Sequence, residues 1–202
     1  MALTNLPTLE EVRIWKARKS LAYFTQRTKP DYLMGWVHRE ICDALDKFLD
    51  DVRAKRSPRL IITMPPRSGK SELVSRRFPA YAFGRFPDLQ IIATSYSSDL
   101  SQRFNRDVQR IIDDEKYREI FPETTLNGSR VRPDSRGSYI RTSDLFEIVG
   151  HAGAYRSCGV GGGITGQGAD CLLIDDPVKD RAEANSATVR QSIWDWYTST
   201  AY

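Results

Sequence analysis

The chain has 202 residues, 40% apolar and 28% charged, and its 30 Lys and Arg against 26 Asp and Glu give a net charge of +4. These values are typical of a globular protein whose core is large enough to fold without disulfides or a structural metal. No long apolar run and no leader-like N-terminus occurs, so neither a membrane span nor secretion is predicted. The three cysteines are widely spaced, which favours a reducing cytosol over a disulfide framework. With only two histidines and no Cys-x-x-Cys, a zinc site is not expected.

The N-terminal part of the chain is predicted to be helical. Residues 1–30 form an expected basic helical extension, with one helix over about 8–26 that opens with the capping-box spacing of Thr8 and Glu11. The remaining residues, 31–202, are expected to form a single domain. Within it, apolar residues recur every three or four positions from about Trp36, which predicts a second helix.

Three short apolar runs rich in β-branched residues predict buried strands. These runs are Arg59–Met64, Gln90–Thr94 and Cys171–Ile174. Further elements are expected between and after them: a helix from Gly69 that bends or ends near Pro79, a helix from Ser98, a hairpin over Tyr139–Gly150, and a last helix over Ala182–Tyr197. Strands that alternate with helices predict an α/β fold, with a parallel sheet covered by helices on both faces.

The segment Met64–Ser71, MPPRSGKS, lies between the first predicted strand and its helix, the setting that a phosphate-binding P-loop requires. A glycine lets the backbone turn tightly, and the free N–H groups at the helix start point at the anion. The lysine places positive charge between the β- and γ-phosphates, and the serine hydroxyl is a ligand for Mg²⁺. The motif therefore predicts ATP and Mg²⁺ as cofactors, bound by Arg67, Ser68, Gly69, Lys70 and Ser71. The alternative is a proline-rich turn with a solvated lysine.

Two carboxylates follow the third predicted strand. Asp175 and Asp176 lie at its carboxyl end, where the ligands of parallel sheets bind. ATP hydrolysis needs one carboxylate to hold the metal and a group that orients the attacking water. We therefore assign Asp175, with Ser71, to Mg²⁺ and Asp176 to activation of the water. A strand that ends in an ordinary turn is the alternative interpretation.

Other side chains carry weaker signals. Arg67, three residues before Lys70, is placed to reach the γ-phosphate and joins Lys70, Asp175 and Asp176 as a predicted catalytic residue. For the remaining candidates, packing or solvation is the commoner role, and a functional role is the alternative. They are Trp36 and His38 for an adenine contact, Arg103, Arg106 and Arg110 for DNA phosphates, and Arg141 and Arg156 for an arginine finger.

Taken in order along the chain, these motifs resemble the N-terminal ATPase domain of the large terminase subunit, the DNA-packaging motor of tailed bacteriophages and prophages. Met64–Ser71 is similar to that family's proline-containing Walker A motif, and Thr94–Leu100 to the strand-to-helix segment after it. Gly159–Asp170 is similar to the glycine-rich lead into Walker B, and Asp175–Tyr197 to Walker B with its trailing helix. The likeness extends from about Trp36 to the C-terminus.

The resemblance implies a P-loop NTPase fold of the ASCE type and a motor that couples Mg-ATP hydrolysis to translocation of double-stranded DNA into a procapsid. It also implies a homo-oligomeric ring that works with a portal protein and a small terminase subunit in the cytoplasm of the bacterial host cell. No membrane partner is expected.

The sequence departs from the family pattern in several respects. Met64 stands where Walker A begins with glycine, and Asp176 stands where related motors often have glutamate, so Glu183 is kept as an alternative catalytic carboxylate. The family continues past position 202 into a coupling strand and a nuclease domain, which predicts a fragment or truncated product without nuclease activity. Because the coupling strand normally lies between the Walker A and Walker B strands, we expect an incomplete sheet with unpaired edges.

Two other functions remain open from the residues alone. A helicase-like DNA translocase would use the same core but separate the strands of a duplex. A catalytically inactive remnant that binds DNA or a partner would show salt-sensitive DNA binding without nucleotide turnover.

Overall fold

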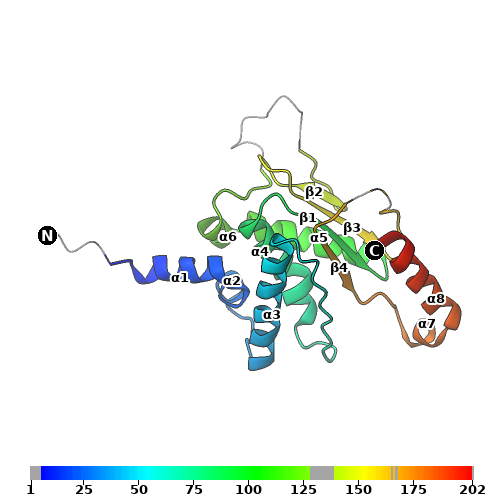
Figure 1. Ribbon diagram of the computed structural model, residues 1–202. Coiled ribbons are helices and arrows are strands. Elements are labelled where there is room, and N and C mark those ends of the chain that lie inside the picture. The colour runs from blue at the N-terminus through cyan, green and yellow to red at the C-terminus, as the bar shows by residue number, and fades with distance from the viewer. Residues whose placement is uncertain (1–5, 128–138, 165, 167, 202) are drawn as a thin grey trace.

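The computed structural model describes residues 6–127, 139–164, 166 and 168–201, and in this part a four-stranded sheet is flanked by helices (Figure 1). The strands are β1 (Gln90–Ser95), β2 (Leu145–Glu147), β3 (Ala154–Gly159) and β4 (Cys171–Asp175). Their order in the sheet is β2-β3-β1-β4. The central strand β1 pairs in parallel with β3 and β4, whereas β2 is antiparallel to β3, so the α/β class is confirmed with a mixed sheet.

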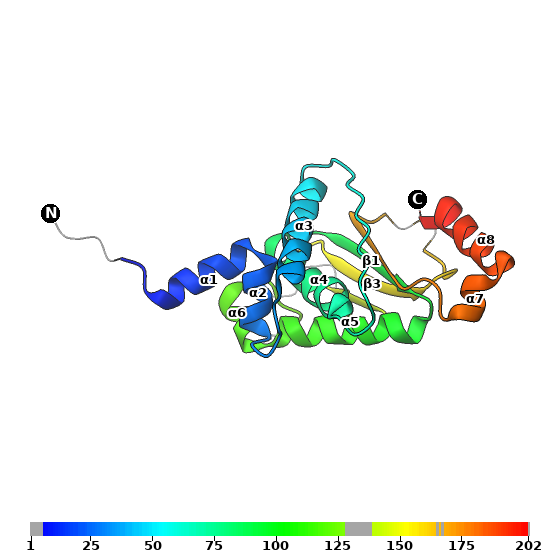
Figure 2. The ribbon, with the colours of Figure 1, turned by 90° about the horizontal axis from the view of Figure 1, so that it is seen from below.

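Eight α-helices and two π-helical segments are described. The α-helices are α1 (Leu9–Lys19), α2 (Leu21–Thr28), α3 (Trp36–Arg53), α4 (Phe78–Arg85), α5 (Ser98–Asp113), α6 (Glu115–Ile120), α7 (Arg181–Asn185) and α8 (Ala187–Trp196). The π-helical segments are η1 (Glu72–Arg77) and η3 (Tyr197–Ala201). Helix α5 runs along one face of the sheet against β3 and β1, while α1 and α8 lie at opposite ends of the molecule (Figure 2).

Strand β1 is buried on both faces. Successive strand residues point to opposite sides of a sheet, and Ile91 and Ala93 accordingly join the main core, whereas Ile92 joins a small second cluster with Ile164 and Trp196 of α8. A strand in the middle of such a sheet is covered on both faces, so its sequence is continuously apolar rather than alternating. The apolar run of β1 fits this position.

The main core extends from the sheet into the helical layer through an aromatic cluster. Phe24 of α2 lies with its ring centroid 5.4 Å from that of Tyr81 in α4 and 5.9 Å from that of Tyr117 in α6. Phe121 completes the group, with its ring centroid 6.0 Å from that of Phe24, 6.2 Å from that of Tyr81 and 5.5 Å from that of Tyr117. These are the separations that tilted and edge-on aromatic pairs prefer. Helix α2 is thus part of the core.

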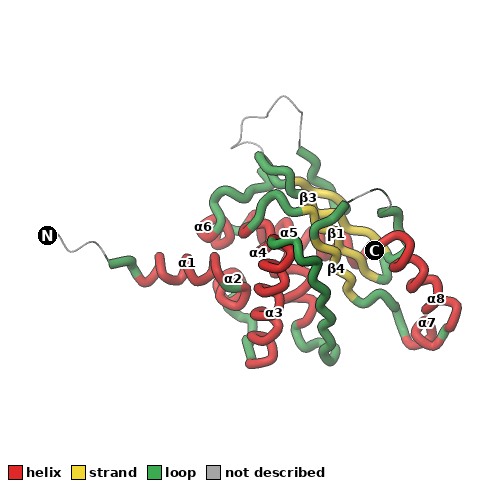
Figure 3. Tube along the Cα trace, in the orientation of Figure 1, coloured by secondary structure: helices red, strands yellow, loops and turns green. Residues whose placement is uncertain are grey.

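The strand predicted over Arg59–Met64 is wrong. The segment is drawn as loop in Figure 3, and the exposed fraction of Ile61 is 90%, although Ile62 and Met64 pack against the core. Within the described residues β4 pairs with β1 alone, so no strand lies beside this segment to accept its backbone hydrogen bonds. The chain keeps the alternating in-and-out pattern of a strand without the pairing that defines one.

Two predicted helices are each divided in the structure. The predicted N-terminal helix breaks at Ser20, whose backbone is extended (φ −144°, ψ 127°), and α2 begins with the Leu21 N–H donating to the carboxylate of Asp46. The predicted C-terminal helix breaks at Ser186, whose side chain caps the start of α8 by accepting from the Val189 N–H. Serine competes for backbone groups in this way, which makes it a frequent helix boundary.

The region between β1 and β4 differs most from the prediction. The expected hairpin over Tyr139–Gly150 is reduced to a bridge between Arg141 and Phe146, and β2 pairs instead with β3. Strand β3 itself was not predicted, because its Arg156 and Ser157 interrupt any apolar run. The predicted strands at β1 and β4 and the predicted helices at α3 and α5 are confirmed.

Candidate active site

The carboxyl ends of the parallel strands meet at one edge of the sheet. Ser95, the last residue of β1, lies in register with Asp175 of β4 on one side and with Gly159 of β3 on the other. The next residue after β4, Asp176, is tied to this edge by its carbonyl oxygen, which accepts the Tyr96 N–H at 3.1 Å. Both predicted carboxylates therefore occupy the edge where open parallel sheets bind ligands.

The P-loop is held by contacts from the chain before and within α3. Gly69 has φ +84°, and a Cβ at this position would lie 2.4 Å from the hydroxyl oxygen of Tyr32, so only glycine fits the turn. The Tyr32 hydroxyl donates to the Gly69 carbonyl at 3.4 Å. His38 accepts the Gly35 N–H at Nδ1, and its Nε2 therefore carries a proton and donates to the Ser68 carbonyl at 2.9 Å.

Lys70 lies between the two carboxylates, although Asp176 is 106 residues away in sequence. Its Nζ is 2.5 Å from Asp176 Oδ1 and 3.3 Å from Asp175 Oδ1. Burial by itself lowers the pKa of Lys70, but the hydrogen bond that Lys70 donates to Asp176 and the charges of Asp175 and Asp176 raise that pKa above its ordinary value. The lysine is therefore a cation at neutral pH, with two anions as its partners.

The second oxygen of Asp175 has a partner that the sequence analysis missed. Ser75 Oγ donates to Asp175 Oδ2 at 2.6 Å, and both residues are buried. Ser75 lies within η1, after the P-loop motif ends at Ser71. The sequence shows it only as one more polar residue in the helix that follows Lys70.

Two residues of the site have left-handed backbone conformations without being glycine. They are Arg67 with φ +61° and Asp176 with φ +46°. Such a conformation costs roughly 1–2 kcal/mol per residue. It persists only where the surrounding structure fixes it, and such residues cluster at functional sites. Both residues had been predicted as catalytic from their positions alone.

The oxygen groups at this edge fit a magnesium ion that arrives with phosphate. Asp175 is a carboxylate and Ser71, half-buried just before η1, carries a hydroxyl, and Mg²⁺ is typically bound by one or two such groups together with phosphate oxygens and water. Within the described ranges no group of three or more His, Cys, Asp and Glu side chains is placed to bind a metal. The donor set therefore suits a nucleotide-bound ion better than a metal held by the protein alone.

The other residues predicted near the nucleotide differ in their exposure and in their contacts. Arg67 is exposed on the loop. Ordinary packing was the favoured role for Trp36, and that expectation is wrong, because its exposed fraction is 80%. Glu183 is engaged within its own helix start, where its Oε2 accepts the Lys179 N–H at 2.9 Å, whereas Asp176 lies against Lys70.

The arginines predicted for DNA contact or as an arginine finger lie outside the P-loop, and two of them have acidic partners. Arg141 forms an ion pair with Asp113 and donates from Nε to the Gln109 side chain at 3.0 Å, which ties it to α5. Arg110 pairs with Asp107 at 3.0 Å. The remaining predicted arginines are Arg103 and Arg106, exposed on α5, and Arg156, half-buried on β3.

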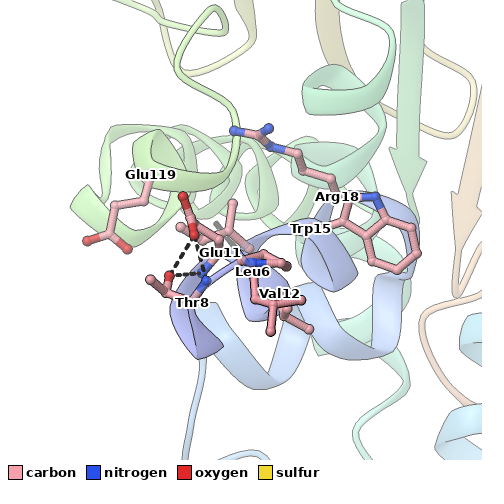
Figure 4. A pocket seen from close by; sticks show the side chains of 9 residues that line it. Leu6, Thr8, Glu11, Val12, Trp15, Arg18 and Glu119 are labelled. Carbon is pink, nitrogen blue, oxygen red and sulfur yellow. Dashed lines mark hydrogen bonds between the residues drawn. The ribbon is translucent and has the colours of Figure 1, made fainter. Parts of the chain in front are cut away.

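A groove of about 1010 Å³ lies beside α1 and is shown in Figure 4. Leu6, Val12 and Trp15 line its apolar part, and its charged lining consists of Glu11, Arg18 and Glu119. Neither the P-loop nor β4 contributes a residue to it. The groove has two carboxylates against one arginine, whose Nε donates to the Ile120 carbonyl, and it has no P-loop amide. It is therefore a poor site for phosphate, and the strand edge remains the candidate.

An α/β sheet, a glycine-turned loop and a lysine set against carboxylates at the strand ends define a protein of the P-loop class. The family described as "Terminase large subunit, T4likevirus-type, N-terminal" matches residues 61–202, and the chain belongs to this family. The resemblance drawn from the motifs is thus confirmed, and with it a role in bacteriophage DNA packaging. Comparison with curated proteins and with solved structures found no match. Across the described residues, every helix is too short or too polar to cross a bilayer.

Proposed function

We propose that this chain is the ATP-hydrolysing part of a DNA-packaging motor, in which Mg-ATP binds at the carboxyl edge of the sheet. One observation carries the proposal: Lys70 of the P-loop lies within 3.3 Å of Asp175 and Asp176, which directly follow the apolar run of β4. This is the pair of elements that phosphoryl transfer needs, a cation for the phosphates beside a carboxylate for the metal.

The proposed roles follow from the position of each group. Lys70 would bind the β- and γ-phosphates, with backbone N–H groups at the start of η1 and the exposed Arg67 as further partners. Ser71 and Asp175 would hold Mg²⁺, which when bound offsets the charge of the phosphate oxygens. Asp176, with an exposed side chain, would accept a hydrogen bond from the attacking water.

The ion pairs of Lys70 give nucleotide binding a definite first step. Since the Lys70 ammonium already contacts Asp175 and Asp176, phosphate must replace at least one of these carboxylates as its partner. We propose that the exchange releases Asp176, which is the more exposed of the two carboxylates. Its carboxylate would then be free to orient water only when a γ-phosphate is present.

Membership of the family supports proposals about partners as well. We propose double-stranded DNA as the translocated substrate, a homo-oligomeric ring as the working assembly, and the portal protein and small terminase subunit as its partners in the host cytoplasm. Arg141 or Arg156 would act in trans as an arginine finger only if the ring places it at a neighbouring P-loop.

The test is calorimetric binding of a non-hydrolysable ATP analogue with Mg²⁺, followed by turnover with and without duplex DNA. Lys70→Ala removes the phosphate-binding cation, so we expect saturable binding by the wild type and its loss, together with turnover, in the variant. Lys47→Ala, on the exposed face of α3, is the matched control for loss of one ion-paired lysine. Equal binding by Lys70→Ala and the wild type would exclude the P-loop assignment.

Two alternatives are separated by their own assays. A helicase-like translocase on the same core predicts strand separation, whereas a packaging motor leaves the duplex intact. An inactive remnant that binds DNA or a partner is favoured by one observation: the segment that enters the P-loop, residues 60–64, is loop rather than a strand of the sheet. It predicts salt-sensitive DNA binding by a folded protein that does not bind the ATP analogue.

A further inference from the structure

The contact between Ser75 and Asp175 joins two elements 100 residues apart at the centre of the candidate site. The exposed fractions of Ser75 and Asp175 are 5% and 8%, and the distance from Ser75 Oγ to Asp175 Oδ2 is 2.6 Å. A hydrogen bond from a hydroxyl to a buried carboxylate is among the stronger protein hydrogen bonds, because the acceptor is charged and water is excluded.

The two oxygens of Asp175 have different partners. Oδ2 accepts from Ser75, on the inner side, and Oδ1 faces the Lys70 ammonium at 3.3 Å. A carboxylate with one oxygen fixed cannot rotate freely about its Cβ–Cγ bond. Ser75 therefore determines which oxygen of Asp175 is presented to the P-loop and in which plane it lies.

The backbone of η1 explains how Ser75 comes to face β4. The N–H of Phe78 donates to the carbonyl of Leu73, five residues back, which is the bond of a π-turn. The next residue, Pro79, has no N–H, and its ring would clash with the carbonyl four residues earlier, which is that of Ser75. A wider turn relieves this clash and adds one residue to the helix between Lys70 and α4. Such insertions are frequent at functional sites.

We propose that Ser75 is a positioning residue for Asp175, which orients the carboxylate as a ligand for nucleotide-bound Mg²⁺. This inference rests on the proposed function of the site. Ser75 acts through Asp175 and contacts neither phosphate nor metal. Groups that orient a metal ligand in this way typically contribute 10- to 100-fold to metal affinity.

The experiment measures ADP binding by calorimetry twice for each protein, once in EDTA and once with Mg²⁺. We expect Ser75→Ala to bind metal-free ADP within about twofold of the wild type, because Lys70 and the loop amides are untouched. We expect the gain in affinity on adding Mg²⁺ to fall by at least about tenfold. Ser75→Thr keeps a hydroxyl at the same position and should retain most of that gain.

Ser157→Ala is the matched control, since Ser157 is a core serine of the same exposed fraction, 5%, whose hydroxyl also makes hydrogen bonds, and it lies on β3 rather than at the site. It should leave the Mg²⁺-linked gain unchanged, and circular dichroism should show that each variant is folded. If Ser75→Ala does not fold, Ser75→Cys, a weaker donor of similar size, takes its place.

Several results would overturn the inference. An unchanged Mg²⁺-linked gain in Ser75→Ala, or an equal loss in Ser75→Thr or Ser157→Ala, would mean that Ser75 has a packing role only. Such a result leaves the proposed function standing, provided that wild-type binding depends on Lys70. A folded wild type that binds no ADP under either condition would overturn both the inference and the proposed function.

Discussion

Two segments of similar residue type have different structures in this protein. Arg59–Met64 (RLIITM) and Gln90–Ser95 (QIIATS) are both short, apolar and β-branched, yet only the second forms a strand. Strand β1 lies between β3 and β4 with Ile91 buried, whereas Ile61 of the first segment is exposed to solvent. The comparison teaches that β-propensity describes a fit to neighbours more than a preference of the chain itself.

Hydrogen exchange should show the largest difference between the two segments. The amides of Ile91 to Thr94 belong to the hydrogen-bonded ladder of a central strand. Among the backbone hydrogen bonds of the described residues, none involves an amide of residues 60–64. We expect exchange of the β1 amides to be on the order of 10³-fold slower or more, because it requires opening of the core. Mass spectrometry of peptides that cover each segment is the measurement. Comparable rates in both would mean that the first segment is paired in solution.

A pair of matched substitutions tests the same contrast in stability. Ile91→Ala removes a fully buried side chain and should lower the free energy of unfolding by about 2–5 kcal/mol. Ile61→Ala makes the same chemical change on an exposed side chain and should alter it by less than about 0.5 kcal/mol. Urea denaturation measures both. A large loss in Ile61→Ala would show that this residue is covered in the working protein.

The elements that the sequence predicted correctly are those with a strong local pattern. The helical period of α3 and α5 and the unbroken apolar runs of β1 and β4 specify their structure through burial on one or both faces. Strand β3 was missed because Ser157 is a polar residue in the core, where Asn105 and the loop carbonyls of Ser143 and Asp144 satisfy its hydroxyl. Partners so distant in sequence are not visible to a local pattern.

The same limit applies to the candidate site. The positions of Lys70 and Asp175 could be predicted, because each stands at a fixed place in a short motif next to a predicted element. Ser75 could not, because its role depends on the π-turn and on a strand 100 residues away. Tyr32 is a further example, since it closes against Gly69 across 37 residues. Motifs therefore identify the chemistry, and only the fold identifies what holds it in place.

Asp46 provides a smaller test, in the helical layer that packs beside the sheet. Its carboxylate accepts the Leu21 N–H, and burial raises its pKa to about 6, which exceeds the opposing effects of that hydrogen bond, of Tyr81 and of Arg85. The folded protein therefore binds this proton more tightly than the unfolded chain, whose ordinary Asp pKa is about 3.9. Stability from this group is present below about pH 4 and is lost as the pH rises to about 6.

Asp46→Asn keeps an oxygen acceptor for Leu21 but cannot ionise, so it isolates this effect from those of the surface carboxylates. We expect the stability of the variant relative to the wild type to increase by about 1–2 kcal/mol between pH 4 and pH 7, somewhat less than the full pKa shift implies because Asp46 is partly solvated. Urea unfolding at the two pH values measures it. A difference that is constant with pH would show that burial does not raise the pKa of Asp46 in the folded protein.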